Sequence, residues 1–465
     1  MVPLLRFQLK PMKKNSWIPL VLLFAFNLSV NAQEKKWTLE ECVTYALDHN
    51  ISIKQTALDT ETATIDKKGA IGNFLPSFNA NASHSWNIGL NQDITTGLLQ
   101  NQTTQFTSVG STVGVDIYRG LQNQNTLRKA SLSIVAAKYQ LVKMQEDVAL
   151  NVANAFLQVL FNKENLKVQK DQLAINEKQL SRSQELVQAG SIPSGDLLDA
   201  KATVAGDNQR LIAADNALLI SKLSLSQLLQ LKDFENFDVE DGTEMRDENN
   251  ILAQTPVSIY DVAKGNRTEL KIAQTNLEIA EKNLAIAKGA FQPTLQGFYN
   301  FNTRISYSDI AVRDNQGAIV GVQSAPPFFD QFSSNKGQSF GMQLSVPIFN
   351  GFSARNNVER SKVGLEKSKI ALEQQDLDLE RNVYLAFTDA KGALKAHESS
   401  LVALESRQAA FDYAKEKYDV GLMNSFELNQ SQTLLSNAQS EVLRSKYDYI
   451  FKIKILEFYF GIPII

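Results

Sequence analysis

The chain has 465 residues, and its 47 basic and 50 acidic residues leave a net charge of only −3. This balance, with basic residues scattered along the chain, does not indicate a nucleic-acid-binding protein. The single cysteine, Cys42, excludes an intramolecular disulfide framework, and the modest Gly and Pro content excludes a fibrous or disordered chain.

The N-terminus has the pattern of a secretory signal. Lys13 and Lys14 precede a short apolar run, 17–26, and Val30-Asn31-Ala32 offers small residues at the spacing of a signal peptidase site. The apolar run is shorter than the ~20 residues that a membrane-spanning helix needs. We therefore expect residues 1–32 to be a cleaved signal peptide and the mature protein to be exported.

The rest of the chain contains two copies of one unit. Gly110 aligns with Gly341 and Gly190 with Gly421 at a single offset of 231 residues (421 − 190). Upstream the offset is 217, so the second copy carries 14 additional residues (231 − 217) before Gly341. We assign 33–232 to the first copy, 233–256 to a polar linker in an equatorial region, and 257–465 to the second copy.

Each copy is predicted to contain a helix, two strands, a very long helix, a tight turn and another long helix. The first helix is expected over roughly 39–71, and over 258–290 in the second copy. The very long helices are expected over roughly 121–189 and 352–420, and about 70 residues extend roughly 105 Å at 1.5 Å per residue. Their apolar residues form a narrow stripe flanked by Gln, Asn, Lys and Glu, so the helices should pack side by side with water nearby.

Four segments alternate apolar and polar residues as strands of a transmembrane barrel do, with about 9–11 residues per crossing. The apolar rows are Phe78, Ala80, Ala82, His84, Trp86, Ile88 and Leu90; Val109, Ser111, Val113, Val115 and Ile117; Leu295, Gly297, Tyr299, Phe301 and Ile305; and Phe340, Met342, Leu344, Val346 and Ile348. Phe298 interrupts the third polar row. Trp86, Tyr299, Tyr307 and Phe349 are expected near strand ends as an aromatic girdle, and 91–107 and 302–336 as loops outside the cell.

These strands cannot form a barrel from one chain. An open sheet edge in hydrocarbon leaves unpaired backbone groups that cost several kcal/mol each, so copies of the chain would have to complete the wall. Three chains give twelve strands, enough for a barrel with a lumen. A soluble, half-buried sheet shows the same alternation and stays open as an alternative.

The repeat, the strand positions and one turn sequence together resemble the TolC family of outer-membrane efflux proteins. The turn reads Lys417-Tyr418-Asp419-Val420-Gly421-Leu422 and is followed by Ser425, Glu427 and Leu428. The resemblance implies a fold that is mixed all-α plus transmembrane β: very long antiparallel helices form an α-barrel through the periplasm, and four strands per chain form the 12-stranded β-barrel of a homotrimer. It also implies a periplasmic adaptor, an inner-membrane RND or ABC pump, outer membrane lipid around the barrel, and passive conduction.

The resemblance also implies site residues. Helix-turn tips that dock the adaptor fall on Ala189, Gly190 and Ser191 and on Val420, Gly421 and Leu422. Gate candidates at the periplasmic entrance fall on Glu427, Gln430, Asp196, Asp199 and Tyr418. A family Arg that locks the closed state falls on Met423, so its bonds cannot be carried over. From the residues alone, Gly190 and Gly421 fit left-handed C-caps, Ser194 and Ser425 fit N-caps, and the carboxylates fit helix N-termini, so a structural role stays open.

No catalytic or cofactor site is predicted. The three histidines and Cys42 are dispersed without metal-ligand spacing, and no phosphate-binding loop or nucleophile motif occurs. We expect no enzyme, no cofactor and no nucleic-acid partner. The alternative to an outer-membrane channel is a soluble periplasmic coiled-coil protein with a structural or adaptor role.

Overall fold

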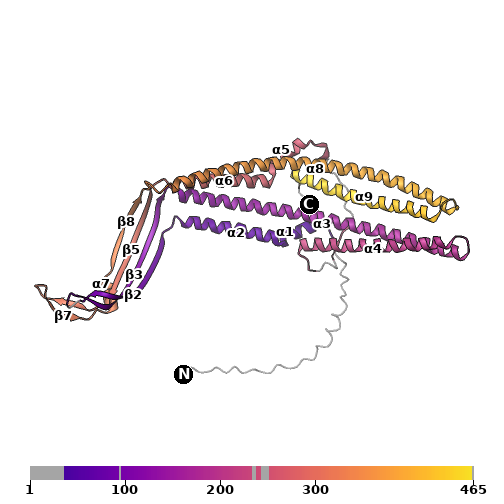
Figure 1. Ribbon diagram of the computed structural model, residues 1–465. Coiled ribbons are helices and arrows are strands. Elements are labelled where there is room, and N and C mark those ends of the chain that lie inside the picture. Colours follow the sequence, from indigo (N-terminus) through magenta and orange to yellow (C-terminus); the bar gives the residue numbers. More distant parts are fainter. Residues whose placement is uncertain (1–35, 94–95, 233–236, 242–250, 463–465) are drawn as a thin grey trace, which may run out of the picture.

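The computed structural model describes residues 36–93, 96–232, 237–241 and 251–462. The expected signal peptide and two segments of the expected linker, 233–236 and 242–250, lie outside the described residues. Within them, long helices run side by side and a four-stranded sheet extends from one end of the helical part (Figure 1). None of the described helices combines the length and the apolar content needed to cross a bilayer.

The element order repeats, as the sequence predicts. The first copy contains α1 (Leu39–His49), α2 (Ile51–Gly72), β2 (Ser77–Gln92), β3 (Leu99–Arg119), α3 (Gln122–Gln188) and α4 (Ser194–Leu229). The second contains α5 (Pro256–Asn266), α6 (Thr268–Gly289), β5 (Thr294–Ser306), β8 (Gly337–Ser345), α8 (Ser353–Asp419) and α9 (Ser425–Phe460). Smaller elements are β1 (Lys36–Trp37), β4 (Asp238–Val239), a 3-10 turn (Ile251–Ala253), β6 (Ile310–Arg313), β7 (Ile319–Gln323) and α7 (Phe328–Ser334).

The first helix of each copy is two helices, not the single helix that the sequence predicts. The breaks lie at Asn50 and Arg267, whose backbones are extended (φ −60°, ψ 131° and φ −64°, ψ 128°). Asn50 caps α2 through the Ser52 N–H (2.9 Å), and its amide donates to the Leu228 carbonyl oxygen (3.1 Å). Hydrogen bonds to other helices compensate for each break. The apolar period of the helix carries no information on such bonds, so it did not indicate the breaks.

The sheet has the antiparallel order β2-β3-β5-β8. Directly paired residues project to the same face of a sheet, and the register pairs Phe78 with Val113, Val113 with Tyr299, and Tyr299 with Phe340. The paired residues of the four predicted apolar rows therefore share one face, which we call the apolar face, and those of the polar rows share the other. Val346 and Ile348 of the fourth row lie beyond the end of β8 at Ser345. Phe298, on the polar face, pairs with Gly114 and Gly341, so its ring has room to lie over the sheet.

The strand ends differ from the predicted ones. Pairing of β2 with β3 continues to Gln92 and Leu99, so most of 91–107 is strand rather than loop. The segment 302–336 contains the end of β5, the β6–β7 hairpin and α7. Trp86 and Tyr299 consequently lie inside their strands rather than near strand ends. Backbone pairing extends these strands through polar sequence, where no apolar alternation indicates a strand.

Two apolar clusters hold the helices together near the middle of the rod. One joins α1, α3, α4 and α9, and the other joins α5, α6, α8 and α9. Helix α9 contributes Tyr447 and Ile450 to the first and Tyr449, Ile453 and Leu456 to the second. Burial of large side chains at about 1.5–3 kcal/mol each fixes the two copies against each other at this level, which we call the equator.

Candidate functional site

Both helix-helix turns lie at the end of the rod opposite the sheet (Figure 1). Gly190 and Gly421 have φ of 71° and 78°, in the left-handed region that glycine adopts without strain. The next residue of each turn donates five residues back: Ser191 N–H to the Leu186 carbonyl (2.8 Å) and Leu422 N–H to the Lys417 carbonyl (2.9 Å). This is the Schellman motif that ends a helix sharply. The flanking residues Ala189, Ser191, Val420 and Leu422 are exposed.

The predicted N-caps are wrong by one residue. Helix α4 begins at Ser194 with Pro193 as its N-cap, and α9 begins at Ser425 with Asn424 as its N-cap. The Asn424 side chain accepts the Glu427 N–H (2.9 Å), so an amide takes the place that the sequence assigned to a hydroxyl. At α4 no side chain caps the helix.

The acidic and amide gate candidates lie just inside the helices that follow the tips. Asp196 and Asp199 are on α4, and Glu427 and Gln430 are on α9; all but the half-buried Asp196 are exposed. Within the described chain no hydrogen bond or ion pair joins these four side chains. No group of three or more His, Cys, Asp or Glu side chains in the described residues is placed to bind a metal ion.

The fifth candidate, Tyr418, belongs to a bridge between the two copies. Its hydroxyl accepts a hydrogen bond from Gln179 Nε2 (3.0 Å), and one residue further Asp419 pairs with Arg182 (2.8 Å). Gln179 and Arg182 are on α3, whereas Tyr418 and Asp419 end α8. Sequence analysis missed three of these four residues, because bonds across 237 residues depend on how α3 packs beside α8. In the sequence, the only indication of this bridge is that Asp419 is next to Tyr418.

Polar side chains fill the interior between the equator and the tips. Asn176, Ser183, Asp207 and Gln432 are buried there, and the Asn176 amide and the Arg210 guanidinium both bond to the Asp207 carboxylate. The interior of this half of the rod is therefore partly polar, whereas the equator is packed mainly with apolar side chains.

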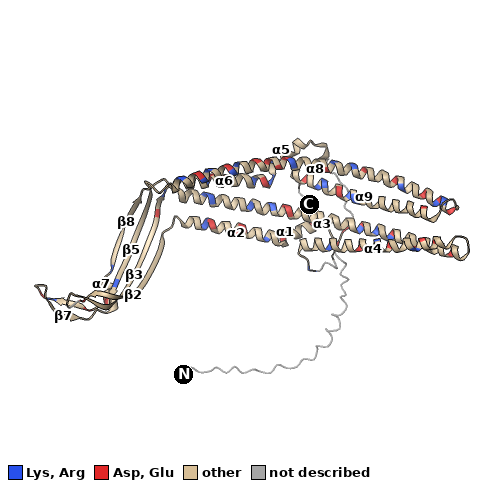
Figure 2. Ribbon diagram, viewed as in Figure 1, with Lys and Arg blue, Asp and Glu red and all other residues tan. Residues whose placement is uncertain are grey.

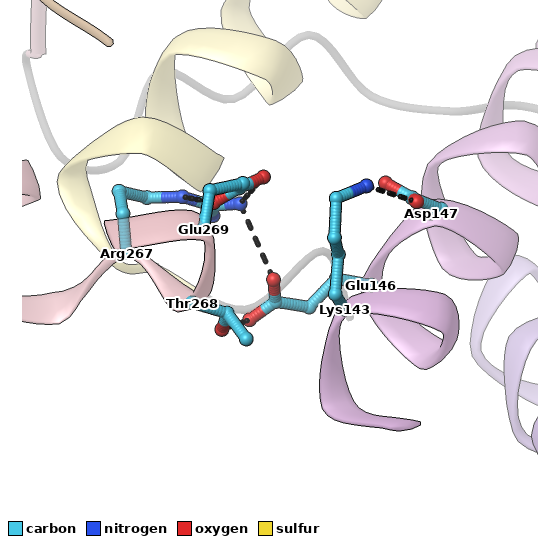
Figure 3. A network of polar contacts seen from close by, with 6 residues as sticks. All are labelled: Lys143, Glu146, Asp147, Arg267, Thr268 and Glu269. Atoms are coloured by element: carbon cyan, nitrogen blue, oxygen red, sulfur yellow. Dashed lines mark hydrogen bonds and ion pairs between the residues drawn. The ribbon is translucent and has the colours of Figure 1, made fainter. Parts of the chain in front are cut away.

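A buried arginine links the copies at the equator (Figure 3). Arg267 is 5% exposed, and its guanidinium bonds to Glu269 (2.9 Å) and to Glu146 of α3 (3.2 Å). Thr268 also donates to Glu146 (3.1 Å). The guanidinium stacks on the Phe458 ring of α9, 3.9 Å from its centroid.

The two carboxylates in this network differ in acidity. Burial raises the pKa of Glu146 more than Arg267 and Thr268 lower it. Burial acts in the same direction on Glu269, but hydrogen bonds and charge from Arg267 outweigh it and hold the pKa of Glu269 below its usual value. The guanidinium therefore offsets the effect of burial on the pKa more strongly at Glu269 than at Glu146.

Short strand β4 is held to the equator by a second ionic cluster. Asp238 pairs with Lys163 (2.8 Å) and Lys222 (3.1 Å). Lys163 also pairs with Asp241 (2.6 Å), which in turn pairs with Lys36 (2.8 Å). Burial would raise the pKa of Asp238, but the hydrogen bonds from the two lysines outweigh it and lower the pKa.

The molecule has two open sides. In the described sheet β2 and β8 are edge strands, and α2 leads directly into β2 while α8 follows β8. Apolar residues seven apart form an exposed stripe on each of these helices. The stripes are Ile51, Leu58 and Ile65 on α2, and Val363, Ile370, Leu377 and Tyr384 on α8. A seven-residue repeat is the pattern by which helices pack against a partner in a coiled coil.

Charge is distributed very unevenly between sheet and helices (Figure 2). The four long strands contain only three charged residues, Asp116, Arg119 and Arg304. Asp116 pairs with Arg119 and contacts Gln296, and Arg304 lies over the Phe106 ring, which places all three on the polar face. The apolar face carries no charge within the strands, although Phe78, Ile88, Phe340 and Met342 are largely exposed there.

Comparison with known proteins supports one reading of this geometry. The model of a family described as "Outer membrane efflux protein" matches residues 43–230 and 259–454. Among solved structures, the chain is similar to CusC (TM-score 0.75, 16% identity, 91% of this chain and 92% of that one). It is also similar to VceC from Vibrio cholerae (0.73, 14%, 92% and 97%) and to CmeC from Campylobacter jejuni (0.73, 17%, 91% and 85%). At such low identity the likeness establishes the fold. No curated protein sequence matches the chain.

Proposed function

This chain belongs to the outer membrane efflux protein family, and on that basis we propose that it is the trimeric exit duct of a tripartite efflux pump or a type I secretion system. Residues 1–32 would direct export. The units 33–232 and 257–465, joined by 233–256, would each supply one sixth of the duct. A periplasmic adaptor and an inner-membrane RND or ABC pump would deliver cargo, which the duct conducts passively.

The main support for this proposal is the sheet, which has two open edges and an uncharged, exposed apolar face. Water would hydrate the unpaired edges of β2 and β8, but it would also meet a continuous row of large apolar side chains. Hydrocarbon suits the apolar face, but each unpaired backbone group there costs several kcal/mol. Pairing β8 with β2 of a neighbouring chain allows the apolar face to contact hydrocarbon and leaves neither strand edge unpaired.

The edge helices support the same closure. At the contact of copy one with copy two, Glu146 on α3 bonds to Thr268 on α6. The repeat offsets place Leu377 (146 + 231) and Ile51 (268 − 217) at the equivalent positions of α8 and α2. Both belong to the exposed stripes, so the polar contact inside one chain has an apolar counterpart between chains. This is a head-to-tail interface, which closes into a ring when the rotation between neighbouring chains is a whole fraction of a turn.

We infer that three chains assemble, because three sets of four strands give the twelve-stranded barrel with a lumen that the family resemblance implies. Polar residues of β2, β3, β5 and β8 would line that lumen. Two chains would give eight strands, and a barrel of that size is filled by its own side chains.

We further propose that the tips close the periplasmic entrance through the bridge of Gln179 with Tyr418 and Arg182 with Asp419. Met423 supplies no arginine for a locking bond, and Arg182 offers a cation from the other copy. The exposed Val420 and Leu422, with Ala189 to Ser191 on the other tip, would dock the adaptor. Glu427, Gln430, Asp196 and Asp199 would then line the entrance.

The central test is a disulfide between chains. The same offsets pair Leu58 with Ile370, because their equivalents Thr275 on α6 and Tyr139 on α3 both line one groove formed by α3, α6 and α8. Oxidised Leu58→Cys/Ile370→Cys protein from outer membranes should run as a covalent trimer in denaturing gels. Leu58→Cys/Val402→Cys is the control, since Val402 is equally exposed but lies 32 residues further along α8, ~48 Å at 1.5 Å per residue. Monomeric protein in the osmotic-shock fluid would refute the duct and favour a soluble periplasmic protein.

A further inference from the structure

Helix α7 lies within the additional residues of the second copy and has no counterpart in the first. It follows Pro326 and Pro327 and contains three aromatic residues in seven: Phe328, Phe329 and Phe332. Phe329 is 81% exposed, and Phe328 is 37% exposed. Neither the barrel wall nor the closure of the sheet uses these rings.

Helix α7 is attached to the part of β5 that β8 does not cover. Strand β8 begins opposite Asn302, so beyond that residue β5 has no strand on this side. The buried Gln331 takes over: its amide accepts the Ser306 N–H (2.9 Å) and donates to the Ser306 carbonyl (2.8 Å). Asn335 donates to the Arg304 carbonyl (2.7 Å). These bonds satisfy the open strand edge and fix the helix in position.

The aromatic residues of α7 continue the apolar face. Phe332 packs on Phe301, with ring centroids 6.1 Å apart, and the Thr303 hydroxyl donates to the Phe332 carbonyl (3.1 Å). Phe301 and Thr303 both project from the apolar face, and Ile305 beside them is fully buried. Phe328 stacks parallel to Phe332, and Phe329 meets Phe328 edge-on. One continuous aromatic surface therefore runs from the sheet onto the helix.

The level of α7 along the sheet matches the end of a membrane crossing. Strand β5 begins at Thr294 beside the helices, and Thr303 is its tenth residue. A crossing strand needs about 9–11 residues, so the contact of Thr303 with α7 lies where hydrocarbon gives way to headgroups. Aromatic rings concentrate at this depth because they combine an apolar body with tolerance of a wet boundary.

We propose that α7 is an interfacial anchor, whose Phe328 and Phe329 enter the headgroup layer of the outer leaflet and set the depth of the barrel in the membrane. The ligand is the lipid surface itself. This inference rests on the proposed function, since it requires the apolar face to contact lipid.

The test measures depth with an environment-sensitive nitrobenzoxadiazole label at single introduced cysteines. Cys42 is buried and can remain, because it is inaccessible in the folded protein. The labelled sites are Phe329→Cys on α7, Phe340→Cys in the middle of the apolar face, and Val320→Cys on the exposed β7. The full-length oligomer is placed in vesicles of phosphatidylcholine and phosphatidylglycerol that carry a nitroxide quencher on the headgroup or deep on the acyl chain.

We expect the acyl-chain quencher to reduce fluorescence most at position 340, the headgroup quencher to reduce it most at 329, and only aqueous iodide to quench 320. Quenching at 340 by lipid, with 329 quenched by iodide alone or by nothing, would overturn the anchor and leave the duct intact. Absence of any quenching at 329 would place Phe329 against a neighbouring chain. Absence of lipid quenching at 340 would instead overturn the membrane placement on which both proposals depend.

Discussion

Replacing Arg267 by methionine should loosen the equator more than any other single charge removal. Methionine keeps much of the apolar volume but leaves Glu146 and Glu269 without their cation, in a site where Arg267 itself is only 5% exposed. Removing one partner of a buried ion pair costs about 3–5 kcal/mol, and loss of the stacking on Phe458 adds roughly 0.5–2 kcal/mol. The two acids are about a quarter exposed, so we expect a total near the lower end, about 3 kcal/mol.

Amide hydrogen exchange is the suitable assay, because it reports local opening in an oligomer whose global unfolding is not two-state. Protection should fall in the first turn of α6 and the last turns of α9. The loss should shrink on acidification: burial already raises the pKa of Glu146, and protonation removes the charge that the variant leaves unpaired.

Lys264→Met is the matched control. It removes an ion pair with Asp376 in which the lysine is 51% exposed, and such pairs contribute only about 0.2–1 kcal/mol. Equal loss of protection in the two variants at neutral pH would refute the reasoning, because burial of the charge would then not determine the cost. A second check is Arg267→Met combined with Glu146→Gln, which should recover part of the loss.

Three further outcomes follow from the structure. Arg182→Met removes the exposed ion pair with Asp419, worth about 0.2–1 kcal/mol, and should raise single-channel conductance or open time in planar bilayers up to a few-fold; no change in either quantity would exclude this pair from the gate. The lowered pKa of Asp238 means that its stabilisation is present above the ordinary aspartate value near 3.9 and is lost as pH falls further, so exchange of β1 and β4 should accelerate below about pH 4. Asp238→Asn should reduce that acid dependence, and Asp241, whose pKa Lys163 and Lys36 also lower, should account for the remainder. Gly120→Ala should destabilise far more than its repeat counterpart Gly351→Ala: both have φ near 60°, but a Cβ at 120 collides with the Gly289 carbonyl oxygen whereas position 351 is open. Equal melting shifts for the two alanine variants would contradict this.

Several surfaces could be predicted from sequence because they depend on local periodicity. The very long helices were expected over 121–189 and 352–420 and are observed over Gln122–Gln188 and Ser353–Asp419. The division of each strand into an apolar and a polar row also needed only alternation, since side chains of a strand alternate by geometry. That Phe78, Val113, Tyr299 and Phe340 share one face depends on the strand register. Glycines at both turns could be identified because a left-handed residue is needed wherever a helix ends so sharply.

What the tertiary structure alone decided are the contacts between elements far apart in the chain. The bond of Arg182 to Asp419 spans 237 residues and has no local signal. The break at Arg267 is tolerated because Glu146, 121 residues earlier, lies opposite it. Helix α7 lies on β5 because β8 begins only at Gly337, opposite Asn302, and leaves a strand edge that Gln331 satisfies. Periodicity records which side of an element is apolar, whereas the partner of a polar group is fixed only when the packed elements bring donor and acceptor within reach.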